Sequence, residues 1–321
     1  MSAVRVVFLG RLAKEDVSAT LKKVPGIDLL VTEDFAQMLK ALRGAEVLVT
    51  PDIRGDERKL LSDALRSSDR SVRWIQCLSA GYEGLVRHGL PEDVVLTNQG
   101  GAVGPAVAEQ AMALLLALAR RLPEAVAAKP RHEWDHSYTG NITALEGRNL
   151  AVIGFGHIGK EIAKRARAFE MTVLGVSRSG TNHPLAHEMH PVTELRTVLA
   201  RAEAIVVAAP QTHETLKLIG AAELAVCKPE TLFVNVSRGG LVDTAALTEA
   251  LQKRRIAGAG LDVTEPEPLP PDHPLWDCPN LIITPHVAGG VSKKSRARIL
   301  KVVAENFARY LAGKPVEHVV R

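Results

Sequence analysis

The sequence contains little of what disulfide-rich or nucleic-acid-binding proteins depend on. Its 321 residues include three cysteines, Cys77, Cys227 and Cys278, which lie far apart and form no C-x-x-C pair. A disulfide scaffold and a thiolate metal site are therefore not expected, and a reducing compartment such as the cytoplasm is favoured. Aromatic residues make up 4% of the chain, which leaves few rings to stack on nucleic-acid bases.

Long runs of one kind of residue are also missing. The longest apolar run, residues 111–119, is about half as long as a membrane-spanning helix requires. The chain does not begin with a basic segment followed by a long apolar stretch, so no signal peptide is expected. The formal net charge of +4 is spread without a basic block, so neither a nucleic acid nor a membrane is an expected partner.

The histidines do not form a recognisable metal motif. His183, His187 and His190 lie close together, and His187-Glu188 begins like the zinc motif H-E-x-x-H. The second histidine comes one residue too early and Pro191 follows, so two ligands would not share one face of a helix. No metal is expected.

The sequence does contain an alternation of short β-branched runs with segments of helical periodicity. Such runs lie at 4–9, 27–31, 47–49, 74–78 and 94–96, and a second series begins at residue 149. This alternation is typical of βαβ units around a parallel sheet. At about 100–200 residues per domain, it predicts an α/β protein of two lobes.

One predicted helix is unusually apolar. It covers residues 106–122, directly after Pro105, and beyond Glu109 and Gln110 it has almost no polar side chain before residue 120. Because such a helix cannot face water, we expect it to be buried between domains or between subunits. A last amphipathic helix is predicted over residues 292–311.

A G-x-G-x-x-G sequence formed by Gly154, Gly156 and Gly159 follows a predicted strand and opens a helix. In this context the first glycine permits a tight turn, the second lets the backbone approach a pyrophosphate, and the third allows close helix–sheet packing. The phosphates would then lie at the helix N-terminus. The plainer alternative is a glycine-rich turn without a ligand.

The end of the next strand bears on which dinucleotide would bind. An NAD-binding fold places an acidic residue about 20 residues further on, whereas an arginine accommodates the 2′-phosphate of NADP. Here the strand ends in Ser177, Arg178 and Ser179, with no acid among them. This favours NADP(H), with NAD(H) as the second possibility. The alternative is that Arg178 is a solvated surface side chain.

Several segments in order carry a wider resemblance. They are Ser79-Ala80-Gly81-Tyr82, Ala106-Val107-Ala108-Glu109, the three glycines, Ala209-Pro210 with Thr215, Asn235 through Asp243, Leu261-Asp262-Val263, Glu267-Pro268-Leu269 and Thr284-Pro285-His286. Together they resemble the D-isomer-specific 2-hydroxyacid dehydrogenases over nearly the whole chain. The resemblance implies two Rossmann-like or flavodoxin-like lobes with parallel sheets. A cofactor lobe, residues 102–287, would be inserted into a substrate lobe made of residues 1–101 and 288–321.

The resemblance also implies roles for individual residues. Arg238 would bind the substrate carboxylate and polarise the keto oxygen, His286 would protonate that oxygen, and Glu267 would hold the imidazole. The backbone of Ser79, Ala80 and Gly81 would also contact the carboxylate. Besides the three glycines, the expected cofactor contacts are His157, Ile158, Ser177, Arg178, Ser179, Ala209, Pro210, Thr215, Val236, Ser237, Arg238, Asp262, His286, Ala288 and Gly289.

The function implied is NADPH-dependent reduction of a small 2-keto acid, of the glyoxylate or hydroxypyruvate kind, to a D-2-hydroxy acid. A homodimer formed through the apolar helix is expected, as in these enzymes. Two alternatives stay open. One is an NAD-linked relative such as a D-lactate or 3-phosphoglycerate dehydrogenase. The other is a dinucleotide-sensing corepressor-like protein, because the corepressors of this fold keep the same arginine, glutamate and histidine.

Overall fold

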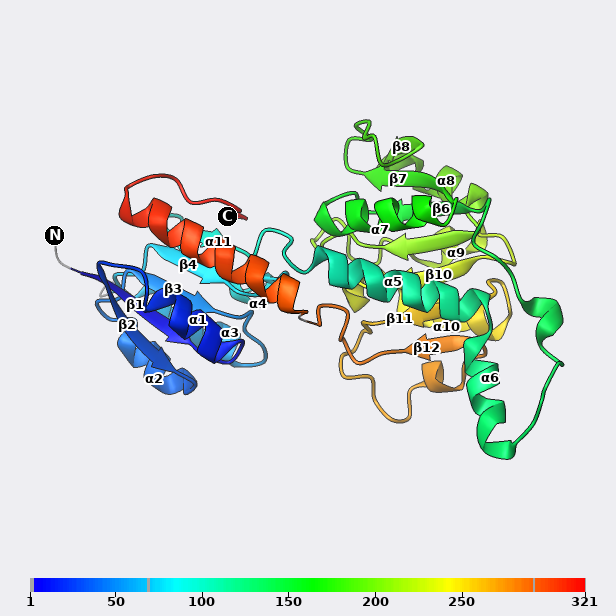
Figure 1. Cartoon of the computed structure of the whole chain (residues 1–321), viewed down its shortest axis with the longest axis horizontal. Helices are drawn as coiled ribbons and strands as arrows, with labels where there is room; N and C mark the ends of the chain where they lie inside the picture. Colours follow the sequence, from blue (N-terminus) through cyan, green and yellow to red (C-terminus); the bar gives the residue numbers. More distant parts are fainter. Residues whose placement is uncertain (1–2, 68–69, 291, 321) are drawn as a thin grey trace. The chain divides into compact units, whose positions relative to one another are not determined.

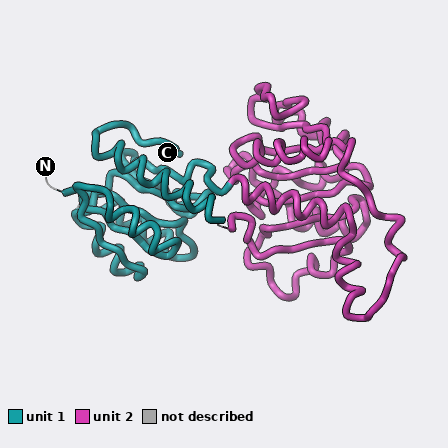
Figure 2. Tube along the Cα trace, viewed as in Figure 1, with its two compact units in different colours: residues 1–103, 291–321 teal, residues 104–290 magenta. Residues whose placement is uncertain are grey.

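The computed structural model describes residues 3–67, 70–290 and 292–320, and the chain divides into two compact units (Figure 2). Unit 1 consists of Met1–Val103 and Val291–Arg321, and unit 2 of Gly104–Gly290. Unit 2 is thus inserted in the sequence between the two segments of unit 1. Its boundaries lie two to three residues from the expected ones.

The described part of unit 1 is built on a five-stranded parallel sheet of order β2-β1-β3-β4-β5 (Figure 1). The strands are β1 Val4–Leu9, β2 Ile27–Thr32, β3 Val47–Thr50, β4 Trp74–Cys77 and β5 Val95–Thr97. The helices are α1 Lys14–Leu21, α2 Phe35–Ala41, α3 Glu57–Arg66, α4 Glu83–Val86 and α11 Lys293–Leu311. This strand order is the flavodoxin-like one, with its reversal between β1 and β3.

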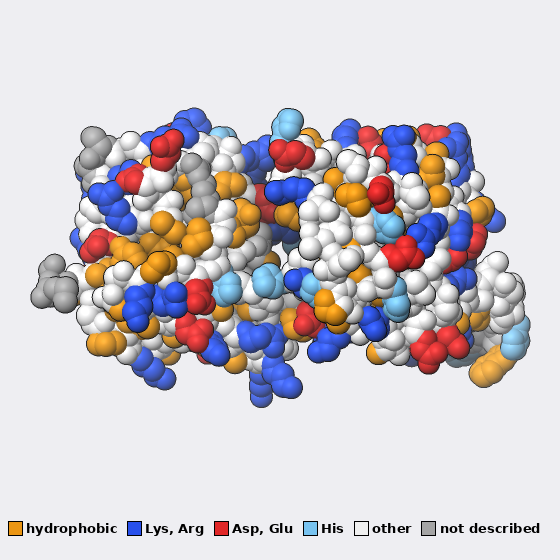
Figure 3. Space-filling view, turned by 90° about the horizontal axis from the view of Figure 1, so that it is seen from above, with side chains coloured by type: hydrophobic (Ala, Val, Ile, Leu, Met, Phe, Trp, Pro, Cys, Tyr) orange, Lys and Arg blue, Asp and Glu red, His pale blue; other side chains and the backbone are white. Residues whose placement is uncertain are grey.

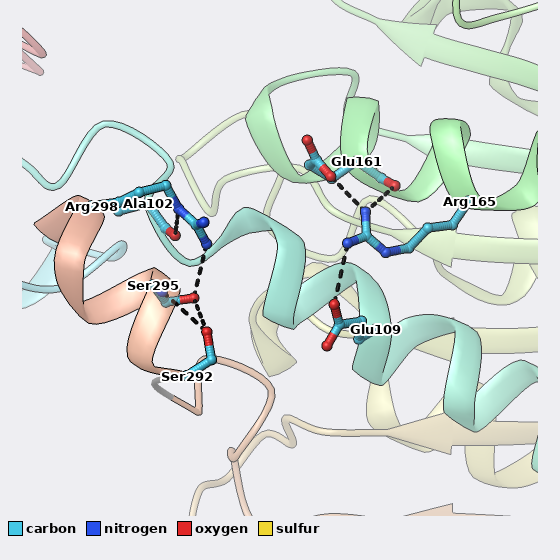
Figure 4. A network of polar contacts seen from close by, with 7 residues as sticks. All are labelled: Ala102, Glu109, Glu161, Arg165, Ser292, Ser295 and Arg298. Carbon is cyan, nitrogen blue, oxygen red and sulfur yellow. Dashed lines mark hydrogen bonds and ion pairs between the residues drawn. The ribbon is translucent and has the colours of Figure 1, made fainter.

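The last helix, α11, is part of unit 1 because its apolar face completes that unit's core. Trp74 of β4 lies with its ring centroid 4.8 Å from that of Phe307 and 5.0 Å from that of Tyr310. Arg298 of α11 donates from Nε to the carbonyl of Ala102 at 2.9 Å and from Nη2 to Ser295 Oγ at 2.9 Å (Figure 4). The end of the first segment is therefore tied to the second.

The described part of unit 2 contains a seven-stranded parallel sheet of order β12-β11-β10-β9-β6-β7-β8. The strands are β6 Asn149–Ile153, β7 Thr172–Ser177, β8 Glu188–Pro191, β9 Ala204–Val207, β10 Leu232–Asn235, β11 Gly258–Leu261 and β12 Leu281–Ile283. The helices are α5 Gly104–Ala119, α6 Leu122–Ala128, α7 His157–Ala168, α8 Leu195–Arg201, α9 Ala221–Ala225 and α10 Thr244–Gln252. Short 3-10 helices are η1 Lys129–Arg131, η2 Thr139–Asn141, η3 Val192–Glu194, η4 Gly239–Leu241 and η5 Pro274–Asp277.

The predicted helix over residues 106–122 is wrong at its end. Helix α5 stops at Ala119, Arg121 takes a left-handed conformation with φ 55°, and α6 starts at Leu122. Pro123 explains the break, because it has no N–H to donate to Ala119 and its ring would clash with that carbonyl in a continuous helix.

The burial of α5 also has a different cause from the one expected. Its buried side chains, among them Val107, Met112 and Leu115, belong to a helix that packs on α7 and on strands β10, β11 and β12 of its own unit. On its outer side, Glu109 pairs with Arg165 of α7 at 3.3 Å (Figure 4). The apolar composition of α5 therefore requires neither a domain boundary nor a second subunit.

Strand β8 pairs with β7 at the edge of the sheet, and the alternation of β-branched runs did not predict it. Its residues, Glu188 to Pro191, are all half-buried, and two of them are polar. An edge strand of this kind lacks the β-branched run that marks a buried strand.

Within the described residues, no helix is long and apolar enough to span a membrane. Basic and acidic side chains are interspersed over the face in Figure 3.

Candidate active site

The expected site residues of unit 2 lie at one edge of its sheet. Gly154 follows β6, Ser177 ends β7, Ala209 follows β9, Arg238 follows β10, Asp262 follows β11 and His286 follows β12. Because all these strands are parallel, their carboxyl ends meet at the same edge. Neighbouring strands are about 4.8 Å apart. Strands β10 and β12, which lead to Arg238 and His286, are separated by β11, so the two loops leave the sheet roughly 10 Å from each other.

The glycine turn after β6 is built so that backbone can approach a ligand. Gly154 has φ 96°, and a Cβ there would lie 2.4 Å from the amide nitrogen of Ala209. A Cβ on Gly159 would lie 2.0 Å from the carbonyl oxygen of Gly154. Gly156 has no atom within 4 Å of the position that its Cβ would take, so space remains beside the turn.

The first turn of α7 supplies free N–H groups beside that space. Its N-cap residue, Gly156, makes no side-chain hydrogen bond, and His157 and Ile158 begin a helix of 12 residues. An uncapped helix N-terminus carries unsatisfied donors and a partial positive charge, which suits a pyrophosphate. The residues present here therefore fit a dinucleotide.

The loop after β7 is rich in hydroxyl groups. Ser177 Oγ accepts from the Gly180 amide at 3.1 Å, and Ser179 Oγ lies 2.7 Å from Thr181 Oγ1. Arg178 is exposed. The pKa of Glu214 is lowered chiefly by the hydrogen bond from Thr212, with a smaller contribution from the charge of Arg178, so a carboxylate lies within electrostatic range of the guanidinium.

The loops after β9 and β10 are joined to each other. Thr215 Oγ1 donates to the carbonyl of Pro210 at 2.7 Å, which closes the turn after Ala209. The hydroxyl of Ser237 donates to the carbonyl of Ala209. Val236 is buried, and its amide donates to Val207 at 3.3 Å. The two loops thus form one hydrogen-bonded part of the edge.

Asn235, at the end of β10, fixes the backbone that carries Arg238. Asn235 is 1% exposed; its Nδ2 donates to the carbonyl of Arg238 at 2.8 Å and its Oδ1 accepts from the Ser237 amide at 3.0 Å. Gly239 allows the next close contact, since a Cβ there would lie 2.0 Å from the carbonyl oxygen of Thr264. The half-buried Arg238 side chain donates from Nη1 to Ser237 at 2.7 Å.

His286 and Glu267 form the expected pair. His286 Nδ1 lies 2.8 Å from Glu267 Oε1, and the two side chains are 30% and 32% exposed. The histidine backbone is held at φ 54°, with its amide donating to Asp262 at 2.8 Å and to Thr284 at 2.9 Å. A positive φ is uncommon for a residue with a side chain and marks a conformation imposed by its surroundings. Since Nδ1 faces the glutamate, Nε2 is the ring nitrogen available to a substrate.

Asp262 organises the loop that carries His286. It is 1% exposed, and its carboxylate accepts from Thr284 Oγ1 at 2.5 Å and from the amides of Val287 at 3.0 Å and Ala288 at 2.8 Å. Gly289 follows directly. A buried carboxylate with three protein donors fixes the loop in one conformation. The expected contact of Asp262 with a nicotinamide stays a prediction.

The comparison with protein families adds to this geometry. The model of the D-isomer specific 2-hydroxyacid dehydrogenase, NAD binding domain, matches residues 112–288. The chain belongs to this family. A glyoxylate/hydroxypyruvate reductase B of Pectobacterium carotovorum is 35% identical over 276 residues, 84% of this chain and 84% of that protein. A D-3-phosphoglycerate dehydrogenase of Archaeoglobus fulgidus is 35% identical over 227 residues, but the match covers 71% of this chain and only 43% of that longer protein.

Solved structures of the dehydrogenase family share the fold over the whole chain. A family protein from Aeromonas salmonicida is 30% identical with a TM-score of 0.85, covering 100% of this chain and 99% of that one. An NADPH-dependent glyoxylate/hydroxypyruvate reductase from Sinorhizobium meliloti, in complex with NADP and malonate, is 28% identical with a TM-score of 0.78. That match covers 99% of this chain and 97% of the other.

The segment expected to contact the substrate carboxylate lies in unit 1, after β4. The Ser79 hydroxyl accepts from the Asp52 amide at 3.0 Å, and the carbonyl of Ala80 accepts from Asn98 Nδ2 at 3.2 Å. The Asp52 carboxylate accepts from the Gly84 and Leu85 amides at 3.2 and 3.0 Å, at the start of α4. Burial raises the pKa of Asp52, and those backbone hydrogen bonds oppose the shift.

Sequence reasoning did not assign the residues that position others. Asn235 and Thr284 lie inside motifs named in the sequence analysis. Asn235 ends β10 and Thr284 directly follows β12, so their position at the end of a strand was a usable signal. Asp52 and Asn98 belong to no motif. Their only signal is a position one or two residues after β5 and β3, where parallel strands present polar side chains to one edge.

Proposed function

We propose that this protein reduces small 2-keto acids, of the glyoxylate or hydroxypyruvate type, to D-2-hydroxy acids with NADPH. The observation that carries the proposal is the His286–Glu267 pair, 2.8 Å apart, at the sheet edge that also presents Arg238 and the glycine turn. Relatives named as glyoxylate/hydroxypyruvate reductases support the substrate type.

The chemistry needs a cation and a proton donor at the keto oxygen. When bound, the reduced nicotinamide supplies a hydride to carbon C2. Negative charge then develops on oxygen, and the guanidinium of Arg238 stabilises it while binding the neighbouring carboxylate. His286 Nε2 gives its proton to that oxygen, so the products are the hydroxy acid, the oxidised cofactor and neutral histidine. Glu267 keeps the imidazole oriented.

The proposed cofactor contacts divide along the sheet edge. The turn of Gly154, Gly156 and Gly159 and the first turn of α7 would hold the pyrophosphate. Ser177, Arg178 and Ser179 would hold the 2′-phosphate by charge-assisted hydrogen bonds. The loops at Ala209, Ser237 and Ala288 would line the rest of the dinucleotide. In this assignment unit 2 is the dinucleotide-binding unit and unit 1 the substrate unit.

The proposal is tested by turnover with a panel of 2-keto acids and both reduced cofactors. We expect glyoxylate and hydroxypyruvate to be reduced, with a higher kcat/KM for NADPH than for NADH. A higher kcat/KM for NADH with pyruvate or 3-phosphohydroxypyruvate would favour the NAD-linked alternative. Dinucleotide binding without turnover of any keto acid would favour the corepressor-like alternative.

We also propose that the enzyme is a homodimer, and that the segment beginning at α6 mediates it. This segment extends from the body of unit 2 (Figure 1), and Leu122, Val126 and Trp134 are 49%, 70% and 89% exposed. Exposed apolar side chains gathered on one segment commonly mark a protein interface. Light scattering should give about twice 34.5 kDa. Val126→Glu should shift the mass toward the monomer, and a monomeric wild type would refute the dimer.

The unpaired cysteines suit a cytoplasmic enzyme.

A further inference from the structure

Gln110 is a polar side chain on the packed face of the otherwise apolar helix α5. It is half-buried, and its neighbours on the same face, Val107 and Leu114, are buried. The preceding residue, Glu109, is exposed and pairs with Arg165 on the outer side of the helix (Figure 4). A polar group on a packed face costs stability unless it has a hydrogen-bond partner. The reason for Gln110 therefore lies in what its amide contacts.

The amide of Gln110 contacts the strand end that leads to His286. Its Nε2 donates to Thr284 Oγ1 at 3.1 Å, across 174 positions of the sequence. The Thr284 hydroxyl in turn donates to Asp262 Oδ1 at 2.5 Å. The amide of His286 donates to the carbonyls of these same two residues at 2.8 and 2.9 Å. Gln110 is thus joined through one hydroxyl group to the loop that carries the proposed proton donor.

The direction of these hydrogen bonds follows from the groups themselves. The Asp262 carboxylate can only accept, so the single hydrogen of the Thr284 hydroxyl points to it. The hydroxyl then has only lone pairs to offer to Gln110, which must present its NH₂ group and not its oxygen. The amide therefore keeps the hydrogen of the hydroxyl on the carboxylate. A side chain that only accepts would compete with Asp262 for that hydrogen.

We propose that Gln110 is a positioning residue for the reaction and acts on His286 through Thr284 and Asp262. The inference rests on the proposed function, because its consequence is the placement of the proposed proton donor. His286 is held at φ 54°, an uncommon conformation that its surroundings must support. Thr284 and Asp262 supply that support, and Gln110 fixes the hydroxyl that joins them. This role requires no contact of Gln110 with substrate or cofactor.

Two variants of nearly the same size separate the hydrogen bond from packing. Gln110→Met keeps the volume of the side chain and removes the donor. Gln110→Glu keeps the shape, but its ionised carboxylate only accepts and competes with Asp262 for the hydrogen of Thr284. We expect Gln110→Met to lower kcat for keto-acid reduction roughly two- to tenfold, with a smaller change in KM. Gln110→Glu should lower kcat further at pH 8.

Acid should restore Gln110→Glu and leave Gln110→Met unchanged. A protonated glutamic acid has a hydroxyl group that can donate to Thr284 as the amide does. Partial burial and the nearby Asp262 carboxylate should raise the pKa of a glutamate at this position above its ordinary value of about 4.3. The kcat of Gln110→Glu, divided by that of the wild type, should therefore rise as the pH falls from 8 to 5. The same ratio for Gln110→Met should stay constant.

The other titratable groups around this contact cannot imitate that result. Glu109 pairs with Arg165 on the outer side of α5, and Glu109→Gln is the matched control that should keep the wild-type pH profile. Ionisation of His286 and Glu267 is common to the wild type and the variants, so it divides out of the ratio. A negative charge near His286 would keep the imidazole protonated to higher pH, which would raise the ratio at high pH and not at low pH.

A double-mutant cycle tests the route through Thr284. Thr284→Val removes the hydroxyl, so adding Gln110→Met to it should change kcat less than twofold, roughly the limit of additivity. Urea unfolding shows that each variant is folded. Equal losses in Gln110→Met and Gln110→Glu at every pH would overturn the positioning role alone, and so would wild-type kcat in Gln110→Met. A wild type that reduces no 2-keto acid would refute the proposed function, and the positioning role with it.

Discussion

The two edges of the unit 2 sheet use polar side chains in opposite ways. At the carboxyl edge, Asn235 and Asp262 are each 1% exposed, and each makes hydrogen bonds that hold the backbone at or next to a proposed catalytic residue. At the amino edge, Arg121, Arg148 and Asn280 keep buried polar atoms without partners. One edge satisfies its buried polar side chains within the chain, whereas the other leaves some of them without a partner.

The difference has a physical reason. A group that stabilises a transition state must be in place before the reaction, because reorganisation during the reaction would consume the stabilisation. Buried partners such as Asp262 serve that purpose at the carboxyl edge. Polar atoms that stay buried without partners, as at the amino edge, cost stability instead.

The largest expected effect comes from removing the proton donor. His286→Ala should lower turnover of the keto acid about 10²–10⁴-fold, the usual contribution of general acid catalysis, while NADPH binding changes little. Steady-state kinetics and titration of NADPH fluorescence measure the two quantities. Glu267→Gln keeps a hydrogen-bonding shape and should lose less than His286→Ala. Wild-type turnover in His286→Ala would mean that another group protonates the oxygen.

A smaller effect is expected at the adenosine end of the same edge. Arg178→Ala removes a charge-assisted contact worth about 1.5–3 kcal/mol, which corresponds to roughly ten- to hundredfold. The KM for NADPH should rise by that factor, and the KM for NADH should stay almost unchanged because NADH has no 2′-phosphate. Equal increases for both cofactors would indicate that Arg178 only shapes the loop, in agreement with its nearness to Glu214.

The carboxyl edge could largely be predicted from the sequence, and the amino edge could not. Gly154, Arg238 and His286 each follow a strand in a recognisable motif, so parallel pairing alone places them at one edge. The end of α5 and strand β8 were missed because Arg121 adopts a left-handed conformation and β8 is a half-buried edge strand. At the amino edge, Arg121, Arg148 and Asn280 are 27 and 132 positions apart, and no local pattern connects such distant residues.

The third prediction tests whether the buried carboxylate of Asp262 stabilises the loop of His286. Asp262→Asn removes the charge and turns one acceptor into a donor that faces an amide N–H. We expect the free energy of unfolding to fall by about 1–3 kcal/mol, measured in urea, together with a lower kcat. Asp243→Asn is the matched control. Asp243 caps α10 by accepting from two amides, and asparagine caps a helix almost as well. Equal losses in both variants would contradict a special role for Asp262.

The smallest effect is expected in unit 1, where Asp52 joins the loop after β3 to the start of α4. Burial raises the pKa of Asp52 in the folded protein, so folding favours the protonated carboxyl. The contribution of this group to stability is therefore fully present below the unfolded pKa and is lost as the pH rises through the raised folded value. Asp52→Asn carries no such titration. We therefore expect Asp52→Asn to be more stable relative to the wild type at pH 7.5 than at pH 4. Urea unfolding at both pH values measures the two free energies of unfolding. A difference that stays constant with pH, or that changes in the other direction, would show that the amides of Gly84 and Leu85 outweigh burial at this carboxylate.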